Sequence, residues 1–142
     1  GADNARWVVT HRGTSLDEVL GVPSVKLVVR DPGSTPEELL AVSRELAIPG
    51  VHPTISGAPF LEVARSGVSK ASALSRVAAG LGIDASEVIA FGDNTNDVEM
   101  LTWAGTGVAM ANASVPALAA ADEVTLDNDA DGVAVVIERL LG

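Results

Sequence analysis

The sequence predicts an α/β fold in which helices cover a parallel sheet, with a smaller α+β region before it. Three observations support this prediction. From residue 88 onward, short apolar runs alternate with segments that have helical apolar spacing, a pattern typical of β–α–β chains. Before residue 66, several strand-like runs surround a single helical segment. Hydrophobic residues make up 47% of the 142, which is enough to build a packed core.

The first region is expected to contain four strands and one helix. The helix is predicted over 36–47, because Thr35 and Glu38 have the spacing of a capping box and Pro36 suits the first helical position. The strand candidates, in chain order, are residues 7–10, 25–30, 51–56 and 60–65.

The second region is expected to alternate helices with strands. A helix over 69–81 should end at Gly82, because glycine tolerates the left-handed conformation of a helix C-cap. Ser114 is expected to cap a later helix. We therefore predict two domains, a partial α+β domain at 1–65 and a parallel-sheet domain at 66–142. The remaining strands are expected at 88–91, 107–110 and 123–126, and the remaining helices at 95–103, 114–120 and 131–141.

Charge and composition exclude several classes of function. The net charge is -10, and all of it arises in residues 81–142, where there are eleven acids and one base. Such a surface repels nucleic-acid backbones, and 3% aromatic residues make a base-stacking platform improbable. No apolar run approaches the ~18 residues of a membrane span, and no secretion signal is recognisable. These features lead us to expect no nucleic-acid or membrane partner. The chain has no cysteine, which is typical of a protein in a reducing compartment, so we expect a cytoplasmic protein.

The strongest candidate for chemistry is the segment Gly92–Asp97, which directly follows the strand expected at 88–91. Ligands of open α/β sheets bind beyond the carboxyl ends of the strands. Asp93 would project there as a hard oxygen ligand suited to Mg²⁺. Asn96 and Asp97 would lie at the start of the next helix, where they could contact a phosphate or metal-bound water. The alternative is a plain turn, since glycine, aspartate and asparagine are all turn residues.

Lys70 strengthens the first interpretation. It lies at the start of the helix expected over 69–81, 23 residues before Asp93. One helix and one strand fill that interval, so both groups can reach the same end of the sheet. A lysine there could neutralise a phosphate and a nearby carboxylate. Considered alone, it could also be an ordinary solvated lysine.

Several short motifs occur in an order that resembles the haloacid dehalogenase superfamily, in particular its Cof-type sugar-phosphatase branch with a C2-type cap. The resemblance covers about residues 25–142 and is most specific over 60–134. It implies a Rossmann-like core whose C-terminal part lies here, together with a partial cap. The motifs are Gly67–Lys70 with Ala73-Leu74, Phe91–Asp97, Glu99–Leu101, Gly107–Met110 and Asn112-Ala113.

This resemblance implies a Mg²⁺-dependent phosphatase that hydrolyses a small phosphorylated substrate, such as a sugar phosphate, through an aspartyl-phosphate. Matched by position, Lys70 is the lysine that steadies the nucleophile and the phosphoryl group. Asp93 is a Mg²⁺ ligand, and Asp97 orients the metal site from outside its inner shell. Asn96 is the amide that contacts phosphate or lies just behind it. Lys70, Asp93 and Asp97 are thus the catalytic candidates.

One element of the family pattern has no match. The opening Asp-x-Asp motif, which carries the nucleophile on an apolar strand, is not found in this sequence. We therefore expect a C-terminal fragment that is inactive alone. The strand at 88–91 would keep an open edge, which the missing N-terminal segment or a second copy of the chain would cover.

Two other functions are compatible with the sequence. Residues 127–138 match the spacing of an EF-hand calcium loop, from Asp127 through Gly132 to Glu138. Against this, 123–126 is expected to be a strand, whereas an EF-hand needs a helix entering the loop. The other alternative is a non-catalytic interaction module that keeps the fold without the chemistry.

Overall fold

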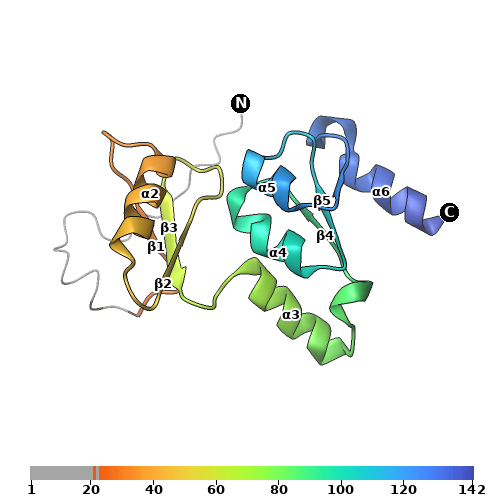
Figure 1. Ribbon diagram of the computed structural model, residues 1–142, viewed down its shortest axis with the longest axis horizontal. Helices are drawn as coiled ribbons and strands as arrows, with labels where there is room; N and C mark the ends of the chain where they lie inside the picture. The colour runs from red at the N-terminus through yellow and green to blue at the C-terminus, as the bar shows by residue number, and fades with distance from the viewer. Residues whose placement is uncertain (1–20, 22) are drawn as a thin grey trace.

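The computed structural model describes residue 21 and residues 23–142, which form two three-stranded sheets (Figure 1). The strand expected at 7–10 lies outside the described residues. The first sheet is antiparallel and the second is parallel with helices packed beside it, so the predicted fold class is confirmed. The division into domains at residue 65 stays a prediction.

The antiparallel sheet is built around a small apolar core. Leu40 of the helix α2 (Pro36–Leu46) packs with Ile55 and Leu61 of the sheet, and all three are buried. The helix begins as expected, because Thr35 accepts a hydrogen bond from the Glu38 backbone and Glu38 accepts one in return. In spatial order the strands are β1 (Leu27–Val29), β3 (Leu61–Arg65) and β2 (Val51–Thr54).

Helix α3 (Lys70–Leu81) lies between the two sheets in the chain and leads into the second sheet. It starts where Ser69 and Ser72 cap each other's backbone N–H groups. It ends at Gly82, whose φ of 70° is the left-handed conformation expected there. The predicted helix is therefore confirmed, and its first residue is Lys70.

The parallel sheet has β5 at its centre. Val108 of β5 and Leu101 of the adjacent helix α4 (Val98–Trp103) are fully buried, which places the main core of this half between that helix and the strand. In spatial order the strands are β4 (Ile89–Gly92), β5 (Thr106–Ala109) and β6 (Glu123–Val124). Gly92 pairs with Ala109, so the carboxyl ends of β4 and β5 lie side by side.

The last two helices follow β5 and β6. Helix α5 is Val115–Ala120 and helix α6 is Gly132–Leu141, in the segments where helices were predicted. Figure 1 shows α6 at the end of the molecule farthest from the antiparallel sheet. Short 3₁₀ turns span Ala85–Glu87, before β4, and Asn128–Ala130, before α6.

Two local predictions need correction. The helix expected over 95–103 begins as a 3₁₀ turn, Thr95–Asp97, because Asn94 and Asp97 cap each other's backbone and tighten the chain before α4. Ser114 occupies the N-cap position of α5, but its hydroxyl makes no capping hydrogen bond. That hydroxyl is buried without a partner in the described part of the molecule.

The edge of β4 is open on the side away from β5, as far as residues 21 and 23–142 are concerned. Ile89 is partly exposed there. Backbone groups on such an edge are available to another strand.

Within the same residues, no helix is both long enough and apolar enough to cross a membrane.

Candidate active site

The turn after β4 is organised by one buried carboxylate. Asp97 is 2% exposed, and its Oδ2 accepts hydrogen bonds from the backbone N–H groups of Asp93 (3.0 Å) and Asn94 (3.1 Å). The Asn94 side chain in turn accepts a bond from the Thr95 backbone at 2.7 Å. These bonds hold the backbone of Asp93 in one position at the end of the strand.

Gly92 makes this arrangement possible. A Cβ atom placed on it would lie 2.5 Å from the Cβ of Asp97, which is far inside van der Waals contact. Any larger residue would push Asp97 away from the turn. The glycine that the sequence suggested for a sharp turn is therefore required by close approach to this side chain.

Lys70 joins this turn from the start of α3. Its Nζ donates a hydrogen bond to the other oxygen of Asp97, Oδ1, and forms an ion pair with it. The predicted convergence of Lys70 on the end of β4 is thus present, with Asp97 rather than Asp93 as its partner. About half of the lysine side chain stays exposed.

Opposing effects set the pKa of Asp97. Burial raises the pKa of the carboxyl group. The hydrogen bond from Lys70, the two backbone N–H groups and the ammonium charge lower it by more, so the pKa lies below its usual value. Asp97 is therefore a carboxylate with both oxygens engaged, which suits a positioning role better than direct ligation of a metal.

Asp93 is available for ligation. It is exposed, and its carboxylate has no hydrogen-bond or ion-pair partner among the described residues. Its backbone oxygen accepts a hydrogen bond from the Ser114 N–H at 2.8 Å, which ties the loop after β5 to the turn after β4. The loops that follow the two strands are thus joined beside Asp93.

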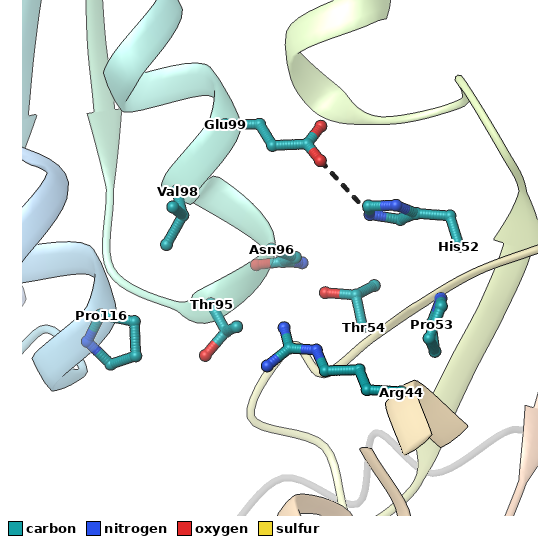
Figure 2. A pocket seen from close by; sticks show the side chains of 9 residues that line it. All are labelled: Arg44, His52, Pro53, Thr54, Thr95, Asn96, Val98, Glu99 and Pro116. Atoms are coloured by element: carbon teal, nitrogen blue, oxygen red, sulfur yellow. Dashed lines mark ion pairs between the residues drawn. The ribbon is translucent and has the colours of Figure 1, made fainter. Parts of the chain in front are cut away.

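A pocket of about 220 Å³ adjoins this turn, and its walls come from both halves of the molecule (Figure 2). Asn96 belongs to its wall, and the Oδ1 atom of Asn96 is buried without a hydrogen-bond partner in the described structure. The antiparallel-sheet half contributes Arg44, His52, Pro53 and Thr54. The other wall consists of Thr95, Asn96, Val98, Glu99 and Pro116.

One ion pair crosses this pocket. The Nε2 atom of His52 lies 3.7 Å from Oε1 of Glu99, which joins β2 to α4 (Figure 2). Through this pair His52 bridges the two halves of the chain. Sequence reasoning missed the wall that includes Arg44 and Thr54, because no local motif marks those residues. Their position depends on how the two sheets meet.

Comparison with known proteins now identifies the family. The family model for haloacid dehalogenase-like hydrolases matches residues 19–137. The chain belongs to the haloacid dehalogenase-like hydrolases. This confirms the resemblance derived from the motifs around Lys70 and Asp93.

Relatives of this hydrolase family cover most of the chain. A Haemophilus influenzae protein is 36% identical over 94% of the chain, which spans 53% of that protein. The phosphoglycolate phosphatase of Methanoculleus marisnigri is 38% identical over 73% of the chain and is itself covered to 44%. A solved sugar phosphatase of subclass IIB of the family has a TM-score of 0.76 at 29% identity, with 89% of this chain and 47% of that one aligned. The chain thus spans about half the length of these relatives.

The haloacid dehalogenase resemblance implies Mg²⁺, and the donor chemistry at the turn fits that ion in part. Asp93 offers an uncommitted carboxylate, a hard ligand of the kind Mg²⁺ prefers. Asp97 has no free oxygen to offer. Nowhere in the described ranges do three or more aspartate, glutamate, histidine or cysteine side chains form a group that could hold a metal. The described residues thus contain one uncommitted carboxylate at this turn, and a metal ion would need further ligands from elsewhere.

The EF-hand alternative does not agree with the structure. The segment before Asp127 contains β6 rather than a helix, and α6 begins at Gly132, inside the would-be loop. Asp127 instead caps the short 3₁₀ turn by accepting a bond from the Ala130 backbone at 2.8 Å. The matching spacing of acids reflects a capped turn before a helix.

Proposed function

We propose that this chain is part of a Mg²⁺-dependent phosphate monoester hydrolase that acts on a small phosphorylated metabolite of sugar-phosphate size through an aspartyl-phosphate. The observation that carries the proposal is the position of Asp97. Its Oδ1 forms an ion pair with Lys70, and its Oδ2 accepts a hydrogen bond from the backbone N–H of Asp93. Three of the proposed site residues thereby meet at one strand end. The nucleophilic aspartate would come from the part of the fold outside this chain.

The proposed roles follow from charge and position. Phosphoryl transfer depends on placing the groups and neutralising negative charge more than on elaborate covalent chemistry. Lys70 is half-exposed beside the turn, where its ammonium group can neutralise a phosphoryl oxygen while Asp97 keeps it in place. Asn96 can present its amide N–H group to the same substrate from the pocket wall.

Asp93 is the proposed ligand for the metal. When bound, Mg²⁺ would neutralise charge on the phosphoryl group during transfer. Asp97 would act behind Asp93, by holding its backbone at the strand end. The remaining ligands would be water, substrate oxygen and the missing part of the fold.

The reaction would proceed in two balanced steps. A carboxylate oxygen of the nucleophile bonds to phosphorus as the ester bond breaks, and the leaving alcohol oxygen takes a proton from a general acid in the missing part of the fold. Water then attacks phosphorus and returns a proton to that group, which breaks the bond to the carboxylate and releases inorganic phosphate. The chain's own part is to bind and orient the phosphoryl group. Without the nucleophile, we expect the 142-residue chain to be inactive.

The open edge of β4 supports the same proposal. A parallel strand paired there would end beside Asp93, as β5 does on the other side. We propose that the missing part of the fold covers this edge and brings the nucleophile to the turn. The relatives, about twice as long as this chain, have the length needed for such a segment.

A chimera tests the proposed function. This chain would replace the matching part of the Haemophilus influenzae relative, and hydrolysis of p-nitrophenyl phosphate would be followed with and without Mg²⁺. We expect Mg²⁺-dependent release of p-nitrophenol that falls by roughly 100-fold or more in Lys70→Met. Arg76→Met, at an exposed residue of the same helix α3, is the control and should leave the rate unchanged.

A non-catalytic module is the second candidate, because the sequence contains no Asp-x-Asp motif. A chimera that is folded by circular dichroism yet hydrolyses no substrate would favour it. A chimera whose rate is insensitive to Lys70→Met would argue against the proposed site itself.

A further inference from the structure

The pocket between the two halves of the chain contains an arginine that no acidic side chain of the described residues contacts. Arg44 lies on α2 and lines the pocket, and within the described residues its guanidinium has no hydrogen-bond or ion-pair partner. Figure 2 shows the guanidinium reaching from α2 toward Thr95, on the opposite wall. A guanidinium group presents five N–H donors and no acceptor. Its natural complement is an anion.

No acidic side chain contacts Arg44 in the described part of the pocket. Glu99 is the acid that lines the pocket, and its carboxylate lies 3.7 Å from His52, with no hydrogen bond or ion pair to Arg44. Figure 2 shows this pair on the side of the pocket away from the guanidinium. The other polar groups of the wall, Thr54, Thr95 and Asn96, are neutral and can donate hydrogen bonds.

The pocket also adjoins the proposed phosphoryl site. Asn96 lines it, and the next residue, Asp97, holds both Lys70 and the backbone of Asp93. A phosphate ester with its phosphoryl group at Lys70 would therefore extend its organic part past Asn96 toward Arg44. A volume of about 220 Å³ suits an organic part of a few carbons.

We infer that Arg44 recognises a second anionic group on the organic part of the substrate. This inference rests on the proposed function, and it narrows the substrate class to phosphorylated acids or bisphosphates. The net charge of -10 opposes anions at long range, but salt screens it within about 8–10 Å, whereas the guanidinium would contact the anion directly. A charge-assisted bond of that kind is about twice as strong as a neutral one.

Binding to the chain itself tests the inference without requiring catalysis. The probes are 3-phosphoglycerate and glycerol 3-phosphate, which differ in having a carboxylate or a hydroxymethyl group at one carbon. Calorimetric titration in Mg²⁺-free buffer should show the acid binding roughly tenfold more tightly than the alcohol. A parallel titration with fructose 1,6-bisphosphate and fructose 6-phosphate tells whether the second anion is a carboxylate or a phosphate.

Arg44→Gln should abolish this preference and leave the affinity for glycerol 3-phosphate unchanged. Arg65→Gln removes an equal charge from strand β3, in the same half of the chain but outside the pocket, and it should retain the preference. Arg44 is exposed, so both variants should keep the circular dichroism spectrum of the parent chain. Equal affinities for acid and alcohol, binding by neither compound, or a preference that survives Arg44→Gln would overturn the inference.

The outcome is separable from that of the proposed function. A chain with an Arg44-dependent preference whose chimera hydrolyses nothing would refute the hydrolase and keep the anion subsite. A chimera that hydrolyses glycerol 3-phosphate and 3-phosphoglycerate equally well, with or without Arg44, would keep the hydrolase and refute the subsite.

Discussion

Lys70 and Asp97 form an ion pair across 27 residues of sequence, which ties the first turn of α3 to the turn after β4. Because the other oxygen of Asp97 holds the backbone of Asp93 and Asn94, one carboxylate connects a helix start, a strand end and the candidate metal ligand. The position of Asp93 and the placement of the Lys70 ammonium charge therefore both depend on the buried carboxylate of Asp97. Single substitutions at and around Asp97 can separate these two effects.

Removing the lysine should destabilise the chain as well as the site. Lys70→Met keeps much of the stem but leaves the buried Asp97 without its cation, which should lower the free energy of unfolding by about 1–3 kcal/mol. The loss should be below that of a fully buried pair because Lys70 is half-exposed. Urea denaturation measures it, with Arg76→Met on the same helix as the control. Equal stability of the two variants would mean that the pair contributes nothing.

Acid should weaken the fold through Asp97. Its pKa is lower in the folded chain than when unfolded, so its contribution is complete above the unfolded pKa of about 3.9 and is lost as the pH falls through the folded value. We expect Asp97→Asn to flatten the loss of stability below about pH 4. Asp84→Asn, at an exposed aspartate whose pKa is also lowered by hydrogen bonds from Ser86, is the comparison. An acid slope in Asp97→Asn that equals the slope of the parent chain would contradict this role for Asp97.

Gly92 should resist even the smallest substitution. In Gly92→Ala the new Cβ would meet the Cβ of Asp97 at 2.5 Å, so the turn must shift, at a cost of about 1–3 kcal/mol. Gly80→Ala on α3 provides the opposite case, because no atom lies within 4 Å of the position its Cβ would take and alanine favours a helix by about 1 kcal/mol. Thermal unfolding should therefore shift down for the first variant and up for the second. A neutral Gly92→Ala would show that the turn can relax.

Mg²⁺ binding by the chain should require Asp93 and should not require Asp127. We expect weak Mg²⁺ binding by the chain, seen as amide shifts of Asp93 and its neighbours in NMR titrations, because one carboxylate and water complete few ligand positions. Asp93→Asn should remove these shifts, whereas Asp127→Asn, in the capped turn before α6, should leave them intact. Shifts that centre on residues 127–132 instead would revive the calcium-loop interpretation.

The open edge of β4 should make the isolated chain self-associate. An exposed strand edge with a partly exposed Ile89 offers backbone pairing and apolar contact to a second copy. Sedimentation should therefore show concentration-dependent oligomers, and Ile89→Lys should shift them toward monomer. Val42→Lys, at an exposed apolar residue of α2, is the matched control. Oligomers that persist in Ile89→Lys and dissociate in Val42→Lys would place the interface elsewhere.

Local chemistry determined much of the fold from the sequence alone. The Thr35–Glu38 capping box, Gly82 at a helix end and the apolar periods all act within a few residues, so they could be predicted without coordinates. Prediction was less accurate where polar side chains compete for the same backbone N–H groups near the start of a helix. Asp97 folds back on the turn and shortens the expected helix, and the Ser114 hydroxyl leaves its cap position unused.

The sequence by itself determined that Lys70 and Gly92–Asp97 would meet at one end of a parallel sheet, because connection lengths and strand direction fix that end. Only the tertiary structure decided that the lysine pairs with Asp97, and that Arg44 and His52 form the facing wall. Those contacts join elements that are far apart in the sequence. Their distances depend on how whole surfaces pack, which no local propensity or spacing encodes.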